Sequence, residues 1–221
     1  MTPKRRRVPT DPLDKANQKT DEQFIADYLQ PDWITSWNHP KSSQNYTLAL
    51  IQPSRISDAD LQACFDLIVE TSKQDYEKSA GKWRPDHKMK EMKSPELRYI
   101  LVKDEETNTV KGFTSLMPTY EEGQPVVYCY EIHLKPELQG TGLGSLLMSF
   151  LVKVAERLPP ITKVMLTCFV ANQRGLNFYE KLGFETDEIS PVERKLRGKV
   201  VKPDYVIMSR TVQGGELRSK D

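Results

Sequence analysis

The sequence lacks any apolar run approaching the roughly 20 residues of a membrane-spanning helix, and its net charge is only +1 over 221 residues. Its three cysteines, Cys64, Cys129 and Cys168, are widely spaced within apolar segments, which argues against a disulfide framework and a zinc site. Near-neutral charge argues against binding nucleic acid over the whole surface. We therefore expect an intracellular protein that needs neither a metal nor direct contact with nucleic acid.

The N-terminal quarter is predicted to be an accessory segment. Residues 1–20 are polar and contain three prolines, so we expect a disordered basic arm. Its basic cluster, Lys4 to Arg7, fits a nuclear-targeting signal, an anion-binding patch or a solvated arm. Residues 21–45 are predicted to form a helical extension, because apolar side chains between Phe24 and Leu29 share one helical face. Residues 46–212 are predicted to form one domain and residues 213–221 a disordered tail.

Apolar periodicity predicts the α/β (α+β) class, with a mixed, mostly antiparallel sheet of about seven strands flanked by helices. Helices are expected after Ser57, after the glycine turn near residue 140 and after Asn172. Residues 72–95 are predicted to hold a second helix, a loop and a short third helix, and residues 190–203 a long basic loop. The predicted strands cover residues 46–51, 97–104, 110–118, 125–134, 163–170, 184–189 and 204–210.

A glycine-rich turn, Gln139 to Gly144 in the order QGTGLG, lies between a predicted strand and a predicted helix. Glycines there let backbone amides approach an anion at a helix N-terminus. A Walker loop is excluded, because Ser145 and Leu146 follow Gly144 where a lysine is required. A dinucleotide fingerprint is also excluded, because Ser145 stands at its last glycine position and no second βα unit carries a ribose-binding acid.

About 30 residues later the segment NQRGLNFYEKLGF begins at Asn172. The two motifs together resemble the GCN5-related N-acetyltransferase (GNAT) family over residues 44–211. The resemblance implies the GNAT fold, acetyl-CoA as co-substrate and transfer by direct attack in a ternary complex without a metal. The cofactor contacts that it implies are Ile132, His133, Leu134, Gln139, Gly140, Thr141, Gly142, Leu143, Gly144, Ser145, Asn172, Asn177 and Tyr179.

The sequence YCYE at residues 128–131, with DYEKSAGKW upstream and DYVIMSR downstream, resembles the NatD type of N-terminal acetyltransferase. That branch modifies the N-terminal α-amine of histone H4 and histone 2A. The resemblance implies a monomer without an auxiliary subunit that acts on these tails in the nucleus and cytoplasm. The substrate-binding residues that it implies are Tyr76, Trp83, Glu121, Tyr128, Tyr130, Glu131, Thr167 and Tyr205.

Strand alternation alone cannot bring Tyr130 and Glu131 to one face. The resemblance implies that a bulge, and splaying of the two strands on either side of the acetyl group, resolve this. An α-amine has a pKa near 8 and a lysine one near 10.4, a difference of roughly 3.5 kcal/mol, so a weak or water-mediated base suffices. Glu131 is the predicted base, ahead of His133, with Tyr128 and Tyr130 positioning the amine. The resemblance implies that Tyr179 protonates the leaving thiolate.

Two departures from the NatD pattern concern the acceptor side. Thr119 stands where the branch has an acid, so a second carboxylate is missing or shifted to Glu121 or Glu122, and Glu131 then also serves recognition. Gly81 stands in the register of a tryptophan, which leaves only Trp83.

Other acceptors and roles stay open. The basic loop suits coenzyme A phosphates or DNA better than an arginine-bearing peptide. A relative acting on lysine side chains or small amines, and a noncatalytic acetyl-CoA-binding interaction domain, are the alternatives. The helix near Phe24 is expected to pack on the domain and brace the peptide site.

Overall fold

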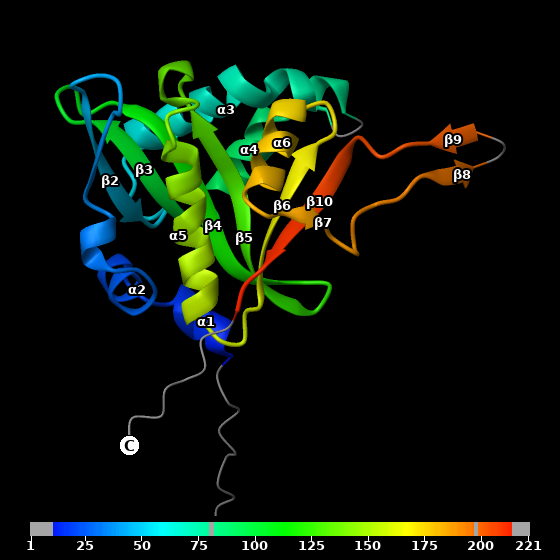
Figure 1. Cartoon of the computed structure of the whole chain (residues 1–221), viewed down its shortest axis with the longest axis horizontal. Helices are drawn as coiled ribbons and strands as arrows, with labels where there is room; N and C mark the ends of the chain where they lie inside the picture. The colour runs from blue at the N-terminus through cyan, green and yellow to red at the C-terminus, as the bar shows by residue number, and fades with distance from the viewer. Residues whose placement is uncertain (1–10, 80–81, 197–198, 214–221) are drawn as a thin grey trace, which may run out of the picture.

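The computed structural model describes residues 11–79, 82–196 and 199–213. Its main sheet has eight strands in the order β1-β2-β3-β4-β5-β6-β10-β7 (Figure 1). All neighbours are antiparallel except β5 and β6. The strands are β1 (Ser36–Asn38), β2 (Asn45–Ile51), β3 (Arg98–Asp104), β4 (Val110–Glu121), β5 (Gln124–Leu134), β6 (Lys163–Phe169), β7 (Glu185–Thr186) and β10 (Tyr205–Thr211).

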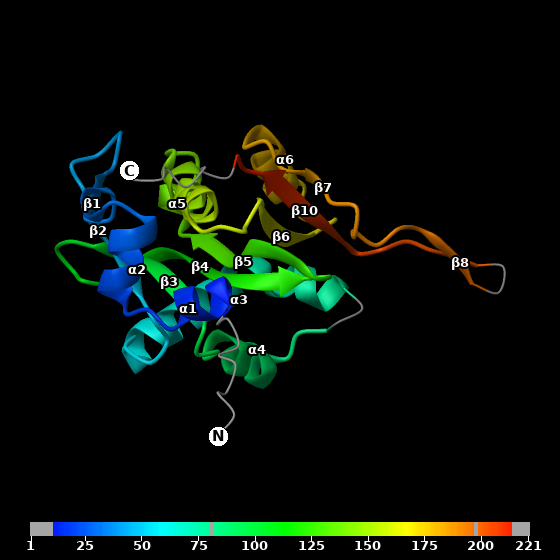
Figure 2. The ribbon, with the colours of Figure 1, turned by 90° about the horizontal axis from the view of Figure 1, so that it is seen from below.

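Helices cover both faces of this sheet, as the view from below shows (Figure 2). The face of α5 (Leu143–Arg157) buries the larger core, and the face of α3 (Asp58–Lys78) and α4 (Pro85–Met92) a second one. The expected mixed α/β architecture is confirmed. None of the helices in the described ranges has both the length and the apolar character needed to span a membrane. The remaining elements are α1 (Pro12–Asn17), α2 (Asp21–Tyr28), α6 (Gln173–Lys181), the 3-10 turns η1 (Pro31–Trp33) and η2 (Pro136–Leu138), and the hairpin of β8 (Arg194–Leu196) and β9 (Lys199–Val201).

Residues 11–20 are folded, which corrects the prediction of a disordered arm over residues 1–20. They contain α1, whose Leu13 and Ala16 are buried against the larger core. The fully buried Arg98 of β3 holds this segment, because its guanidinium donates to Asp21 at 3.0 Å and to the carbonyls at the end of α1 and before α2. Two apolar side chains and one buried arginine therefore order a segment that its composition assigned to disorder. Residues 1–10, with Lys4 to Arg7, and the predicted tail beyond residue 213 lie outside the described residues.

Two predicted boundaries also change. The helix after Ser57 runs unbroken to Lys78 instead of ending near residue 72, because Thr71 and Tyr76 continue its inner face with contacts to His133 and Phe169. The strand expected over residues 184–189 shrinks to β7, because the chain turns at Asp187, which accepts from the Ile189 amide and pairs with Lys163.

The N-terminal extension and the basic loop also contain strands. β1 of the extension pairs with β2, which adds an eighth strand to the sheet. Residues 190–203, predicted as a loop, contain the β8–β9 hairpin, which projects away from the sheet (Figure 1).

Candidate active site

A β-bulge in β5 brings the predicted acceptor-side residues to one face. In the register with β4, Leu116 pairs with Cys129 and Ser115 with Glu131, so Tyr130 is an extra residue. As a result Tyr130 packs against the α3/α4 core and Glu131 reaches Lys88 of α4. Cys129 instead points to the opposite core, where its sulfur lies 3.9 Å from that of Met148 in α5. The expected bulge is confirmed, and it removes the conflict with simple strand alternation.

The adjacent strands β5 and β6 also separate as expected. They pair in parallel from Val126–Lys163 to Cys129–Leu166, and no pairing follows among the described residues beyond that point. The Tyr128 hydroxyl lies 2.7 Å from Thr167 Oγ1, so these two predicted site residues meet across the opening. The rings of Tyr128 and Tyr130 lie 5.0 Å apart. The bulge and the splayed strands therefore place a row of hydroxyl groups at the gap.

Glu131, the predicted base, is buried and already has two partners. Its Oε1 accepts from Lys88 Nζ at 2.8 Å and its Oε2 lies 2.5 Å from His133 Nε2. Burial raises the pKa of Glu131, but the hydrogen bond and charge of His133 and the charge of Lys88 outweigh burial and bring the pKa to about 2. A carboxylate with this pKa is a weak proton acceptor at neutral pH. The geometry therefore supports Glu131 as an ionic partner within the site more than as a free base.

The glycine turn has the backbone expected of an anion cradle. Gly140 and Gly142 have φ of 74° and 90°, and a Cβ added at either would meet no atom within 4 Å. Gly142 precedes α5 and no side chain caps this helix end, so its first amides are left for a ligand. Gly144 serves packing, because a Cβ there would lie 3.2 Å from the Phe178 ring of α6. The turn thus fits the pyrophosphate of coenzyme A through its backbone.

Several predicted cofactor residues shape this region with their side chains. Gln139 Nε2 donates to the Leu134 carbonyl at 2.9 Å and Thr141 Oγ1 to the Leu138 carbonyl at 2.6 Å, so both brace the turn. Leu143 is fully buried in the core, and Ser145 is exposed. Ile132 and Leu134 are partly buried against the core on the α5 face.

On α6, the Asn172 carboxamide caps the helix by accepting from the Gly175 amide at 2.8 Å, whereas Asn177 is exposed. Tyr179 is half-buried on the same helix and packs edge-on against Phe184. Burial first, then proximity to Cys129, Cys168 and Glu131, raises the pKa of Tyr179 well above its usual value. The phenol therefore stays protonated, as a proton donor to a thiolate must.

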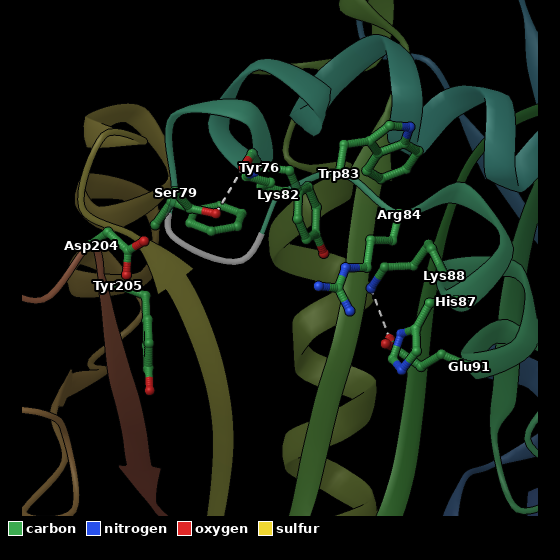
Figure 3. Close-up of a pocket in the computed structure, with 11 residues that line it drawn as sticks. Tyr76, Ser79, Lys82, Trp83, Arg84, His87, Lys88, Glu91, Asp204 and Tyr205 are labelled. Carbon is green, nitrogen blue, oxygen red and sulfur yellow. Dashed lines mark hydrogen bonds and ion pairs between the residues drawn. The ribbon is translucent and has the colours of Figure 1, made fainter.

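A cavity of about 570 Å³ lies beside the gap, between the start of β10 and the α3–α4 connection (Figure 3). Three predicted substrate residues, Tyr76, Trp83 and Tyr205, line it together with Phe169. The ring of Tyr76 packs 5.3 Å from that of Trp83 and 4.9 Å from that of Phe169, which makes an aromatic wall. The polar part of the lining consists of Ser79, Lys82, Arg84, His87, Lys88, Glu91 and Asp204.

The other predicted acceptor residues lie next to the cavity or away from it. Glu121 is the last residue of β4. Burial is the main cause that raises the pKa values of Tyr128 and Tyr130, and the nearby charge of Glu121 raises both further. Glu121 itself has a raised pKa, because of burial and the charge of Glu122. None of the described lining residues comes from α1 or α2, so the N-terminal helix packs on the domain as expected but does not brace this cavity. Gly81 lies outside the described residues.

Among the site residues that sequence reasoning missed, Lys88 and Thr71 contact Glu131 and His133 directly. Lys88 is one of four lysines between residues 82 and 93, and only the packing of α4 against β5 buries this one. Thr71 follows the apolar face of α3 at helical spacing, a weak signal for a partner across the sheet. Within the described ranges no cluster of His, Cys, Asp or Glu is placed to hold a metal ion.

Comparison with known proteins finds a similar sequence and similar folds. "N-alpha-acetyltransferase 40" from Saccharomyces cerevisiae is 33% identical over 178 residues, which cover 66% of this chain and 61% of that protein. The match thus spans about three fifths of that relative's length. Similar solved structures are NAA60 from Arabidopsis thaliana in complex with a bisubstrate analogue (TM-score 0.55, 12% identity, 76% of this chain and 100% of that one) and the ribosomal-protein-S18-alanine N-acetyltransferase from Escherichia coli (0.51, 15%, 79% and 100%).

These two structures support the fold alone, because their sequence identities are low. The family model described as "Acetyltransferase (GNAT) family" matches residues 61–184, which is more than half of the chain and runs from the first turn of α3 past the end of α6. The enzyme class expected from the two motifs, an acyltransferase, agrees with that match. The chain belongs to the acetyltransferase (GNAT) family.

Proposed function

We propose that this protein transfers the acetyl group of acetyl-CoA to the N-terminal α-amine of a protein, and that the tails of histone H4 and histone 2A are its acceptors. The observation that carries the proposal is the bulge at Tyr130, which turns Tyr128, Tyr130 and Glu131 toward one face beside an aromatic-walled cavity. The name of the Saccharomyces cerevisiae relative, an N-alpha-acetyltransferase, supports the same reaction. The histone acceptors rest on the likeness of YCYE and its flanking motifs to the NatD branch.

The chemistry needs a bound cofactor, a positioned neutral amine and a proton donor for the leaving sulfur. The backbone of Gly140 to Gly144 and the start of α5 would bind the cofactor phosphates. Acetyl-CoA, when bound, supplies the thioester carbonyl that the amine attacks. The hydroxyls of Tyr128 and Tyr130 would orient that amine, and Tyr179, neutral at physiological pH, would donate a proton to the sulfur.

The charges near the cavity give mixed support for a basic tail. Glu91 and Asp204 line the cavity, and Glu121 lies near the two tyrosines, so negative charge surrounds the place where an arginine-bearing peptide would bind. Lys82 and Arg84 line the same cavity, and they favour an acceptor with acidic residues close to its N-terminus. This contrast makes the residues after the acceptor's first position the part of the proposal that most needs a test.

The test is mass spectrometry of the peptide Ser-Gly-Arg-Gly-Lys after incubation with the full chain and acetyl-CoA. We expect acetylation of the α-amine, located by fragment masses. The matched control is the same peptide with its N-terminus already acetylated, which should stay unmodified. A peptide with Asp and Glu in place of the basic residues tests the charge preference.

Acetyl groups found only on the lysine would support the side-chain alternative and reject ours. Cofactor binding without any product would support the noncatalytic alternative. Faster reaction of the acidic peptide would keep α-amine transfer and reject the histone tails. We further propose that the protein acts as a monomer in the nucleus and cytoplasm, which sedimentation and imaging of the tagged full chain will test.

A further inference from the structure

The hydrogen bonds of His133 fix where its protons lie. Thr71 Oγ1 donates its proton to the Leu67 carbonyl at 2.8 Å, as helical threonines do. The same oxygen, 2.6 Å from His133 Nδ1, must therefore accept a proton from that ring nitrogen. The other nitrogen, Nε2, lies 2.5 Å from Glu131 Oε2, a distance that requires a proton between the two atoms. Each of the two contacts of the His133 ring thus already contains a proton, and neither ring nitrogen can accept another one.

Lys88 occupies the second oxygen of the same carboxylate. Its Nζ donates to Glu131 Oε1 and to Glu91, each at 2.8 Å, and lies 5.3 Å from the centre of the Tyr76 ring. Burial lowers the pKa of Lys88, but the charges of Glu131 and Glu91 and the hydrogen bond to Glu131 raise it more, so the ammonium stays charged. Lys88 lines the cavity whereas Glu131 does not. The ammonium group therefore stands between the cavity and the carboxylate.

The remaining groups that face Glu131 offer no alternative base. Tyr76 of α3, Tyr99 of β3 and Tyr179 of α6 all have pKa values raised mainly by burial. Burial likewise raises the pKa of Cys129 to about 12. These groups are neutral and protonated at physiological pH, so they can donate a proton but cannot accept one. Of the described groups in electrostatic contact with Glu131, only the ionised carboxylate itself is basic, and both of its oxygens are taken.

We propose that Lys88 and His133 are positioning residues that hold Glu131 fixed and unavailable as a base, so that the site acetylates only amines that arrive neutral. This inference rests on the proposed function and adds how the acceptor class is selected. At pH 7 about one α-amine in ten is neutral, against about one lysine in 2,500. Acceptor ionisation alone then favours the α-amine by about 250-fold, without a contact that recognises it.

Acetyl transfer can be completed without a proton being passed to Glu131, His133 or Lys88. The amine loses its proton to solvent before it binds. Its lone pair forms the N–C bond while the C–S bond breaks. One of the two protons left on the nitrogen ends on the sulfur, with Tyr179 giving its own proton to sulfur and regaining one from the nitrogen side through water.

The decisive test compares two peptides that differ only in the basicity of their terminal amine. We expect the acid limb of kcat/KM against pH to follow each peptide's own amine pKa, measured separately by titration. A limb at the same pH for both peptides would mean that an enzyme group accepts the proton and would overturn the inference, and a shift of that limb in His133→Gln would assign the group to the His133–Glu131 pair. If neither peptide gains an α-acetyl group, the proposed function fails instead. The two failures are therefore distinct.

Substitution of Lys88 gives a second, independent readout. Lys88→Met exposes Glu131 Oε1 to the cavity, and we expect the ratio of α-acetyl to ε-acetyl product to fall at least tenfold. Lys88→Arg keeps charge and donors, and should keep the wild-type ratio. Acetyl-CoA binding and the thermal midpoint establish that each variant is folded. An unchanged ratio in folded Lys88→Met would contradict the role of Lys88, and the two-peptide experiment on the unmodified chain still decides the proposal if that variant does not fold.

Discussion

Two buried ion pairs, one on each side of the sheet, differ in what surrounds them. Arg98 and Asp21 meet at 3.0 Å with side chains 0% and 4% exposed, and Lys88 and Glu131 at 2.8 Å with 10% and 9%. The Nη2 group of Arg98 donates to backbone carbonyls, which cannot titrate, whereas the Lys88 pair continues to titratable side chains and to a cavity wall. Depth of burial therefore does not distinguish a structural ion pair from a functional one. The two kinds of pair differ in the groups that surround them, which are backbone carbonyls in one case and titratable side chains in the other.

The strongest way to break this comparison is Arg98→Met. It leaves the Asp21 carboxylate buried with only Arg55 and the Gln52 amide, so we expect a loss of about 3–5 kcal/mol in the free energy of unfolding. Urea unfolding measures this loss. Acetyl transfer per folded molecule should not change. The control is Arg55→Met, which removes a partner of the same carboxylate but from an exposed side chain, and should have little effect. Equal losses of unfolding free energy in the two variants would show that the buried Arg98–Asp21 pair stabilises the fold no more than the exposed Arg55 contact.

A smaller effect is expected from pH at the second pair. The folded-state pKa of Glu131, about 2, lies below its ordinary value of 4.5, so its ionised form stabilises the fold fully above about pH 4.5. This contribution, about 3 kcal/mol, is lost as the pH falls through the folded value. The stability gap between wild type and Glu131→Gln should accordingly narrow from pH 5 to pH 2 in urea unfolding. A gap that is constant over this range would show that the two donors do not hold an ionised carboxylate.

The smallest effect is expected at two glycines, Gly142 and Gly123, neither of which is part of an ion pair. Gly142 and Gly123 both have positive φ, 90° and 78°, and both have open space where a Cβ would stand. Alanine at either should cost about 1 kcal/mol in stability. Only Gly142→Ala should weaken acetyl-CoA binding, by about tenfold, because only this glycine begins α5. Calorimetric titration measures the acetyl-CoA affinity of each variant. Equal affinities would show that the glycine turn does not bind the cofactor phosphates.

The parts of the site that the sequence predicts are those defined by local backbone. The glycine turn could be recognised because left-handed residues and a helix start leave their own signature within six positions. Tyr76, Trp83 and Tyr205, which come together at the cavity, were found through a resemblance, since they are far apart along the chain. The role of Lys88 could not be predicted, because its burial depends on how α4 packs next to β5.

The errors in the fold have the same origin. Residues 11–20 looked too polar to fold, and their order depends on Arg98, some 80 residues later. The bulge at Tyr130, which was expected correctly, came from the resemblance alone, since the alternation of residue types in β5 continues through it. Local periodicity set the element types, and contacts distant in sequence set the boundaries that it missed.

The place of β10 in the sheet has a consequence for how the protein is made. This strand lies between β6 and β7, and it begins at Tyr205, after every other described strand in sequence. While the chain leaves the ribosome, strands β1 to β5 are available to pair before β10 emerges. The cavity lacks the wall formed by Asp204 and Tyr205 until then, so a nascent chain cannot complete its acceptor site before residue 205 has been made.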